Sequence, residues 1–191
     1  MKRGVSVLIM TGYAGLAGTA MLLNSKKNEL EGRFSKPFLE RTAKLGAEGG
    51  GERAGAVALK NGAECVFEVG EDGVFAGLWT FACYLERGIR ADIRRIPIKQ
   101  ETIEIANHLD VNPYEISGKG AYLISAKPDR KEIIINGLMQ NKINAVCIGE
   151  LNDGNDRVLL NGSSRRFLTP VSRIEDEKKL RETQKNQRGV N

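Results

Sequence analysis

Residues 67–77 have the sequence Phe-Glu-Val-Gly-Glu-Asp-Gly-Val-Phe-Ala-Gly, in which an apolar run leads into an acidic, glycine-containing turn. A short strand is predicted over residues 65–69. A helix is predicted after Gly73, where apolar residues recur at helical spacing until Gly88. A strand that ends in a glycine turn at a helix start directs free backbone N–H groups toward one point, which suits a phosphate. This stretch therefore predicts an α/β unit that carries a ligand loop.

The predicted loop is acidic, which limits what it can bind. Its three carboxylates would repel a phosphate unless a divalent cation lay between them, and carboxylates at a helix start are also ordinary capping groups. Three interpretations stay open: structural capping, a phosphate bridged by Mg²⁺ on Glu68 and Asp72, and other roles. No metal site is assigned firmly. The candidate ligand residues are Glu68, Gly70, Glu71, Asp72, Gly73 and Gly77.

A second glycine turn lies near the start of the chain. A buried strand is predicted over residues 5–10 and a helix over 14–24. Glycine at every third position leaves one helix face bare, so this segment is predicted either to pack closely against another backbone or to bind an anion at the helix start. The candidate residues of this secondary turn are Thr11, Gly12, Gly15, Gly18 and Thr19.

The remaining chain alternates helices with strands, which predicts an α/β layer architecture. An Asn-Asp-Gly-Asn turn at 152–155 is predicted to join the last two strands as a hairpin, so the sheet is expected to be mixed rather than wholly parallel. The other predicted helices span residues 38–45, 52–60, 101–109 and 128–141, and the other predicted strands span 92–98, 121–126, 145–151 and 157–160.

Composition narrows the class of protein. A chain of 191 residues that is 41% hydrophobic can bury one substantial core, so one domain is predicted over 1–174 with a charged, flexible tail over 175–191. The net charge is +5, but 24 acidic residues are interspersed with 29 basic ones, which argues against nucleic-acid binding. The apolar run near the N-terminus is interrupted by glycines, and no other stretch approaches the roughly 20 apolar residues of a membrane-spanning helix. Three separate cysteines in apolar runs indicate a reducing cytoplasm.

Other catalytic patterns are weak. His108 is the only histidine, and no Cys-x-x-Cys pair supports a zinc site. Residues 117–120, Ser-Gly-Lys-Gly, lack the spacing of a Walker loop and are predicted to form a turn. Residues 161–166, Asn-Gly-Ser-Ser-Arg-Arg, combine hydroxyls with two guanidinium groups, so they are predicted as a solvated hairpin end or as an anion site. Trp79 is predicted to serve packing or an interface.

Several motifs carry a family resemblance by their order. They are Thr-Gly-Tyr-Ala-Gly-Leu-Ala-Gly-Thr-Ala at 11–20, Phe-Glu-Val-Gly-Glu-Asp-Gly-Val at 67–74, Ile-Pro-Ile at 96–98, Asn-Pro at 112–113 and Ile-Gly-Glu at 148–150. In this order they resemble the C-terminal half of the AIR synthase superfamily, and within it the HypE-like hydrogenase-maturation branch. The signature loop departs from the family pattern where His, Asp, Thr and Gly are replaced by Phe67, Glu68, Gly70 and Asp72.

The resemblance implies an α/β sandwich whose glycine loop faces an ATP-binding domain, and it implies ATP-dependent activation of an amide, acid or phosphate acceptor. ATP and Mg²⁺ are therefore expected only together with a partner domain, which no part of this sequence resembles. The C-terminal cysteine of the HypE branch has no counterpart either. We expect a domain, catalytically incomplete alone, that binds an anionic small molecule or a protein partner. The alternatives are a subunit of a split ATP-dependent enzyme and a structural homo-oligomer.

Overall fold

The computed structural model describes residues 4–45 and 51–169, so the tail predicted over 175–191 lies outside the described residues. Its centre is a seven-stranded sheet in the order β2-β4-β1-β5-β3-β6-β7. Neighbouring strands are antiparallel except β3 and β6, which are parallel, so the predicted mixed sheet is confirmed. The strands are β1 (Ser6–Thr11), β2 (Cys65–Glu68), β3 (Gly88–Asp92), β4 (Tyr122–Ala126), β5 (Ala145–Asn152), β6 (Arg157–Asn161) and β7 (Ser164–Phe167).

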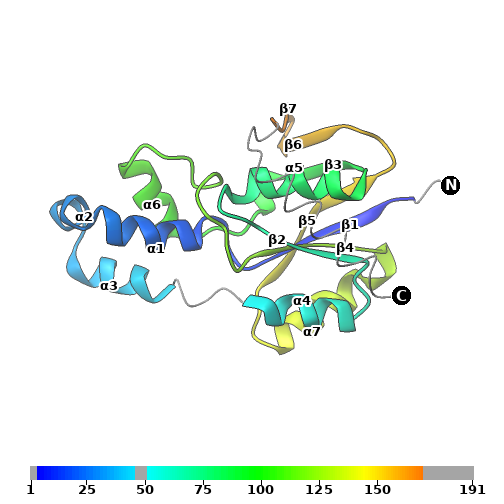
Figure 1. Ribbon diagram of the computed structural model, residues 1–191, viewed down its shortest axis with the longest axis horizontal. Coiled ribbons are helices and arrows are strands. Elements are labelled where there is room, and N and C mark those ends of the chain that lie inside the picture. The colour runs from blue at the N-terminus through cyan, green and yellow to red at the C-terminus, as the bar shows by residue number, and fades with distance from the viewer. Residues whose placement is uncertain (1–3, 46–50, 170–191) are drawn as a thin grey trace.

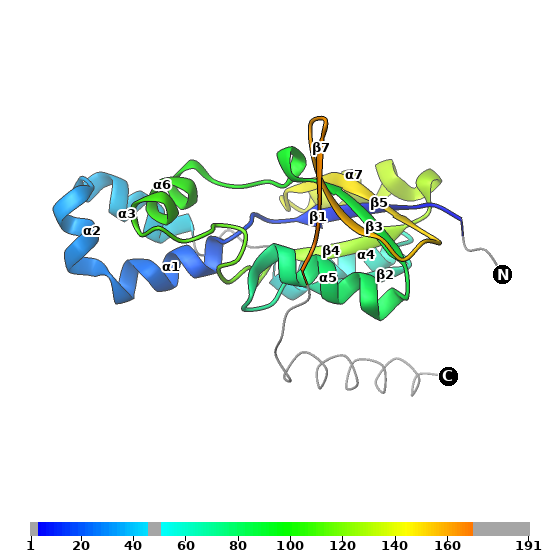
Figure 2. The same ribbon diagram turned by 90° about the horizontal axis from the view of Figure 1, so that it is seen from above.

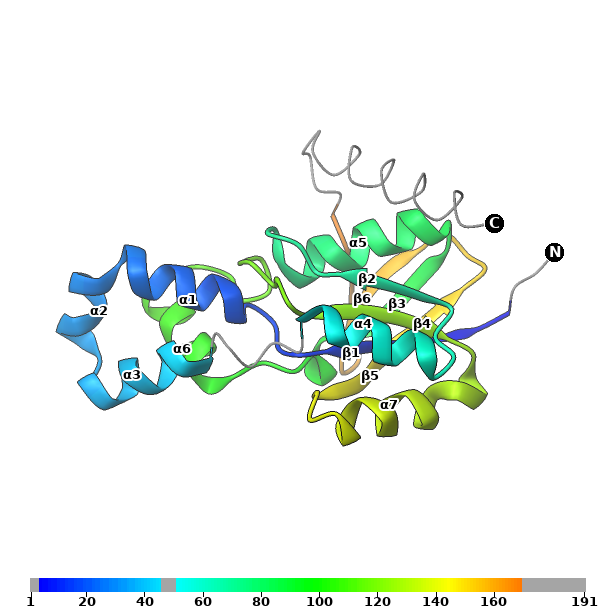
Figure 3. The same cartoon turned by 60° about the horizontal axis from the view of Figure 1, so that its bottom comes forward.

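Helices cover both faces of the sheet and form a separate group at one end of it (Figure 1). One face carries α5 (Gly73–Leu85), and the other carries α4 (Gly51–Lys60) and α7 (Lys131–Gln140). Figure 3 shows the group at the end of the sheet, which contains α1 (Leu16–Ser25), α2 (Lys27–Arg33), α3 (Lys36–Leu45) and α6 (Gln100–His108). No helix in residues 4–45 and 51–169 is long and apolar enough to cross a membrane.

Alternation along β1 places the core on both faces of the sheet. Leu8 and Met10 belong to a buried cluster with Phe81 of α5, whereas Ile9 belongs to a second cluster with Ile134 of α7. Successive strand side chains point to opposite faces, so a central strand that is apolar at each of residues 7–10 must be covered on both faces. Each fully buried aliphatic side chain of this kind contributes roughly 1.5–3 kcal/mol to folding.

The prediction of a strand over residues 92–98 is wrong. β3 ends at Asp92, where that strand was expected to begin, and Ile93–Arg95 form a short 3-10 helix, η1. The Asp92 carboxylate accepts a hydrogen bond from the Arg94 backbone N–H at 3.0 Å. This side-chain cap offers the backbone an alternative to the sheet ladder, and it overrides the β-branched composition.

The hairpin predicted at residues 152–155 is also wrong, because β5 and β6 do not pair. β3 lies between them, antiparallel to β5 and parallel to β6. The turn instead carries the chain past the start of β3, where a Cβ on Gly88 would lie 2.5 Å from Asn152 Oδ1 and 2.9 Å from Gly154 O. A true hairpin follows at Gly162, whose φ of 62° joins β6 to β7, and Figure 2 shows it projecting from the sheet.

Candidate ligand site at the start of helix α5

The predicted ligand loop ends at the first turn of α5 and is covered by residues 113–118. Gly73 has a φ of 78°, and a Cβ there would collide with the carbonyl oxygen of Tyr114 and lie 2.8 Å from that of Ile116. The backbone N–H of Phe75 donates to Tyr114 O at 3.3 Å. One of the backbone N–H groups at the helix start, on which phosphate binding would depend, therefore already donates to a main-chain carbonyl.

The secondary glycine turn meets the same segment. A Cβ on Gly15 would lie 2.5 Å from Pro113 O, and a Cβ on Gly18 would lie 2.7 Å from Ser117 N. The Gly18 N–H donates to Ser117 O at 2.8 Å. Both glycine-rich helix starts thus pack against residues 113–118, and the bare face of α1 serves close backbone approach. This geometry matches the packing interpretation of the secondary turn.

The remaining residues of the secondary turn make hydrogen bonds within the fold. Thr11 Oγ1 is buried and accepts from the Tyr122 N–H at 3.1 Å. Thr19 Oγ1 is also buried, donates to Gly15 O at 2.8 Å and lies 3.0 Å from Thr102 Oγ1. The Gly12 N–H donates to Asn144 O at 3.0 Å. These contacts tie the end of β1 to its surroundings, and they leave the two hydroxyls engaged.

The loop carboxylates contact the turn at residues 117–120. Glu68 Oε1 accepts from the Gly120 N–H at 3.1 Å, and Glu71 Oε1 lies 2.5 Å from Lys119 Nζ. The hydrogen bond to Glu71, with its charge, raises the pKa of Lys119. Asp72 is the N-cap residue of α5. The structure therefore brings the loop and the predicted turn at residues 117–120 together, and the charge of Lys119 offsets part of the negative charge of the loop.

The loop glycines differ in what surrounds them. Gly70 has open space where a Cβ would be, although its carbonyl accepts from the Gly118 N–H at 3.1 Å. Gly77 faces Val69 and Leu123 at ordinary van der Waals distances, so it belongs to the packing beneath α5. Of the two, only Gly70 is placed to let a ligand approach the backbone.

Metal binding at this loop would need help from a ligand. Within the described residues, no group of three or more His, Cys, Asp or Glu side chains could hold a metal ion. Glu68 and Asp72 would supply only part of the near-octahedral shell of Mg²⁺, and phosphate oxygens or water would have to complete it. A phosphate-bridged Mg²⁺ fits these residues better than a site made by the protein alone.

A pocket of about 350 Å³ opens beside the first turn of α5. The guanidinium carbon of Arg166 lies 4.7 Å from the ring centroid of Phe75, which stacks on Tyr114 at 5.0 Å. The pocket joins the ligand loop, through Phe75, to the hydroxyl and guanidinium groups of residues 161–166. Its lining residues are Phe75, Ile93, Asn112, Tyr114, Leu159, Leu160, Asn161, Ser164, Arg165 and Arg166.

Charge and hydrogen bonding make this pocket suited to an anion. In the part of the chain that the structure describes, no ion pair involves Arg165 or Arg166, and both side chains are exposed. Asn112 Oδ1 accepts from the Tyr114 N–H at 3.1 Å, which fixes the segment that forms one wall. Burial raises the pKa of Tyr114, so its phenol stays neutral. Among residues 4–45 and 51–169, no carboxylate lines the pocket.

Sequence reasoning did not assign Asn112 and Tyr114 to a site. Asn112 enters the family resemblance only through the Asn-Pro pair at 112–113, and no local sequence pattern indicates that this stretch lies against α5. The same segment holds Ser117, whose buried hydroxyl has no hydrogen-bond partner among the described residues. Placement of these residues depends on the tertiary fold.

Neither a family model nor a curated protein sequence matches the chain. Solved structures do match its fold. Escherichia coli HypE, a hydrogenase maturation protein, superposes with a TM-score of 0.66 at 18% identity, covering 88% of this chain and 50% of HypE. A chain from the crystal structure of a HypE–HypF complex gives 0.65 at 17% identity, covering 88% of this chain and 54% of that one. The kinase AaThiL, complexed with AMPPCP and TMP, gives a TM-score of 0.59 at 12% identity, covering 90% of this chain and 50% of AaThiL.

These matches confirm the predicted AIR synthase-like fold. At such identities the likeness establishes the fold alone. The chain spans about half the length of the structures that it matches, with coverage of 50–54% for the three above.

Proposed function

We propose that this chain binds an anionic small molecule in the pocket between the first turn of α5 and the β6–β7 hairpin. The observation that carries the proposal is the position of Arg166, 4.7 Å above the Phe75 ring. This contact holds a guanidinium group in the lining of the pocket. Guanidinium groups bind phosphate and carboxylate through paired hydrogen bonds, so Arg166 and Arg165 are the residues that recognise the anion.

The pocket walls indicate an organic anion rather than a bare ion. Ile93, Leu159 and the stacked rings of Phe75 and Tyr114 give an apolar lining, while the arginines, Asn161 and Ser164 provide polar groups. Small-molecule pockets generally combine a mainly apolar wall with a few orienting polar groups, and their volumes begin near 300 Å³. The match to AaThiL, whose structure holds AMPPCP and TMP, supports a phosphate-bearing ligand.

We further propose that the chain does not hydrolyse ATP by itself. Its pocket offers cations to a phosphate, but none of the described residues in its wall is a carboxylate that could serve as a general base. Glu68 and Glu71 of the adjacent loop contact Gly120 and Lys119, respectively. Specific ATP turnover by the purified chain would contradict this part of the proposal.

Isothermal titration with ATP, ADP, AMP and inorganic phosphate, with and without Mg²⁺ and at fixed ionic strength, tests the binding site. We expect saturable binding of a phosphate compound that Arg166→Gln weakens about tenfold, because it loses one charge-assisted contact. The control is Arg53→Gln. In the wild-type chain the Arg53 guanidinium donates to Asn141 Oδ1 at 2.7 Å, and Arg53 does not line the pocket. Absence of binding, or equal weakening by the control, would overturn the proposal.

A second candidate is a subunit of a split ATP-dependent enzyme. The chain covers about half of HypE, and one matched structure is a complex of HypE with HypF, which supports action together with another polypeptide. Glu68 or Asp72 would then help to hold Mg²⁺ and phosphate at the joint site. This candidate predicts Mg²⁺-dependent nucleotide binding that Asp72→Ala abolishes. It fails if ATPase activity with the partner is unchanged by Glu68→Ala.

A homo-oligomer built on the glycine-rich helix and on Trp79 has less support. Gly15 and Gly18 already pack against residues 113–118, and the Arg157 guanidinium carbon lies 4.5 Å from the Trp79 ring centroid. Sedimentation at high protein concentration would decide this alternative. We also propose a cytoplasmic location, since Cys65, Cys83 and Cys147 are free thiols that suit a reducing compartment.

A further inference from the structure

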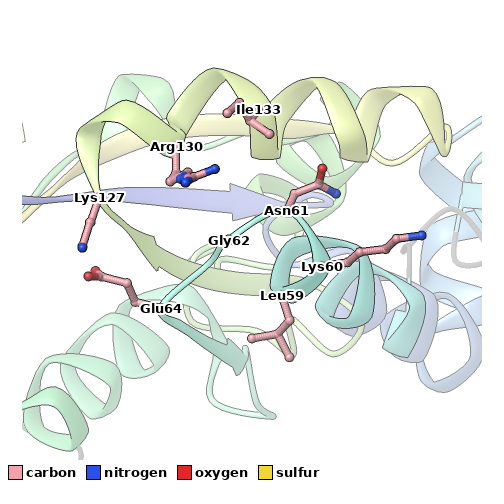
Figure 4. Close-up of a pocket in the computed structure, with 8 residues that line it drawn as sticks. All are labelled: Leu59, Lys60, Asn61, Gly62, Glu64, Lys127, Arg130 and Ile133. Carbon is pink, nitrogen blue, oxygen red and sulfur yellow. The ribbon is translucent and has the colours of Figure 1, made fainter.

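A second pocket lies on the opposite side of the sheet from α5, between the end of α4 and the start of α7. Its cavity volume is about 440 Å³, and Figure 4 shows how its side chains lie. α4 and α7 cover one face of the sheet, whereas α5 covers the other, so this pocket is separate from the ligand site proposed above. Its lining residues are Leu59, Lys60, Asn61, Gly62, Glu64, Lys127, Arg130 and Ile133.

The pocket carries an excess of positive charge. Lys60, Lys127 and Arg130 contribute cations, and Glu64 is the one carboxylate among the described residues that line it. In Figure 4 the Lys127 and Glu64 side chains point toward one another, while Lys60 points outward. Within residues 4–45 and 51–169 no ion pair involves Lys127, whereas Arg130 Nε lies 3.8 Å from the exposed carboxylate of Asp129. The Lys127 ammonium group thus points toward Glu64 without forming an ion pair with it, so it can also contact a ligand anion.

Glu64 is held by a buried arginine through a serine. Glu64 Oε2 accepts from Ser6 Oγ at 3.0 Å, and Ser6 Oγ accepts from an Arg87 guanidinium N–H at 2.7 Å. Arg87 is only 6% exposed. Ser6 of β1 thus links the Glu64 carboxylate to the Arg87 guanidinium. The negative charge of Glu64 is therefore partly balanced before any ligand binds.

The turn after α4 fixes the position of Arg130. Gly62 has a φ of 96°, and a Cβ there would lie 3.3 Å from Arg130 Cδ, so the arginine stem lies across the glycine. Asn61 Nδ2 donates to Val57 O at 2.8 Å, and a Cβ on Gly137 of α7 would lie 2.6 Å from that nitrogen. Close packing of the turn against α7 gives the pocket a preorganised floor, which lowers the cost of binding.

Two large apolar side chains stand at the same pocket. Leu59 is 55% exposed and Ile133 is 46% exposed. They come from the two helices that form the walls, so apolar and cationic groups share one concave surface. A ligand that contacts all of them must itself join an anionic group to an apolar one.

We propose that this pocket binds a small ligand in which a phosphate dianion is attached to an apolar group. Lys127 and Arg130 contact the phosphate, and Leu59 and Ile133 contact the apolar part. Two cationic groups of different shape match the charge of a phosphate monoester, and the guanidinium fork adds directional hydrogen bonds. The site does not depend on the pocket beside α5.

Heteronuclear NMR of the ¹⁵N-labelled chain tests this site with three probes: phenyl phosphate, inorganic phosphate and phenol. At fixed ionic strength, phenyl phosphate is expected to shift the amide signals of Gly62, Arg130 and Ile133 saturably and to bind more tightly than either other probe. Lys127→Gln and Arg130→Gln should each weaken phenyl phosphate binding about tenfold, because each removes one charged contact.

The matched control is Lys131→Gln, because Lys131 directly follows Arg130 at the start of α7 but pairs with Glu132 at 2.9 Å and does not line the pocket. It should leave phenyl phosphate affinity unchanged. Equal weakening in this control, or no saturable shift at Gly62 and Arg130, would overturn the site. Shifts confined to Phe75 and Arg166 would likewise overturn it, while supporting the ligand site beside α5.

Discussion

The guanidinium carbon of Arg166 lies 4.7 Å from the ring centroid of Phe75, so the last hairpin reaches back to the first turn of α5. The Phe75 ring also stacks on the Tyr114 ring, with an angle of 16° between the two ring planes. Three segments that are distant in the sequence thus form one layered contact. Because the guanidinium group rests on an aromatic face, its direction depends on the ring beneath it.

Phe75→Leu should therefore weaken anion binding although it removes no charged group. The loss of one cation–π contact is worth about 0.5–1 kcal/mol at an exposed site, or roughly a twofold to fivefold weakening. Titration calorimetry with the phosphate compound that binds the wild-type chain measures this effect. Phe67→Leu is the control, because Phe67 stacks on Phe81 at 5.6 Å and does not line the pocket. Unchanged affinity in Phe75→Leu would count against an oriented Arg166.

Gly73→Ala should destabilise the fold by about 2–4 kcal/mol, because it adds left-handed strain to a clash with main-chain carbonyls. Its φ is 78°, and a Cβ there would lie 2.8 Å from Ile116 O. Urea unfolding followed by circular dichroism measures the change. Gly70→Ala is the control, since a Cβ at Gly70 meets nothing within 4 Å. Similar losses in both variants would show that residues 113–118 do not cover Gly73.

Gly18→Ala should also destabilise the protein, against the usual preference of helices for alanine. Helix propensity alone favours alanine by about 1 kcal/mol. Here, however, a Cβ would lie 2.7 Å from both Ser117 N and Ile116 Cβ. Gly32→Ala in α2 is the matched control, because no atom lies within 4 Å of its Cβ position, and it should stabilise the protein. Stabilisation by Gly18→Ala in thermal unfolding would contradict the close approach.

Arg87→Met should cost roughly 3 kcal/mol of unfolding free energy, because it leaves buried acceptors without a donor. The Arg87 guanidinium donates to Ser6 Oγ at 2.7 Å and to Leu151 O at 3.1 Å. Arg90→Met is the control, since Arg90 lies three residues further along, in β3, is exposed and lies 3.8 Å from Glu150. A loss below about 1 kcal/mol in Arg87→Met would mean that water replaces the lost donor.

Stability should fall as the pH rises from about 9 to about 11, because burial raises the pKa of the Cys65 thiol from 9.0 to about 11. Above pH 9 the unfolded thiol ionises while the folded thiol stays protonated. The unfolded state then binds fewer protons, so stability decreases with pH until the folded thiol also ionises. Urea unfolding at intervals from pH 8 to 11 should show a steeper fall for the wild-type chain than for Cys65→Ala. Parallel pH profiles would refute a perturbed Cys65.

Local sequence signals located most elements of the fold. The strand at β1 and the helix at α5 follow from apolar periodicity, and the turn at Gly162 follows from its glycine, since each signal acts over a few residues. The strand expected over 92–98 failed because the Asp92 carboxylate caps the backbone of Arg94. That competition is local too, but it depends on a side-chain geometry that composition does not show.

Strand order could not be predicted from neighbouring residues. The Asn-Asp-Gly-Asn turn has hairpin chemistry, yet β3 inserts between β5 and β6. Pairing with β3 buries Ala91 and Leu159 in one cluster, and that gain depends on surfaces far apart in the chain. Turn residues specify that the chain reverses direction, and tertiary packing selects the strand that fills the gap.

The sequence by itself determined that a glycine turn opens α5, that carboxylates crowd that turn, and that two arginines follow a hairpin. Only the tertiary structure decided that residues 113–118 cover both glycine turns, and that Arg166 reaches Phe75. The physical reason is the range of the interactions. Backbone conformation and capping are set within one or two turns of chain, whereas a pocket exists only where distant segments are held together by burial of a shared core.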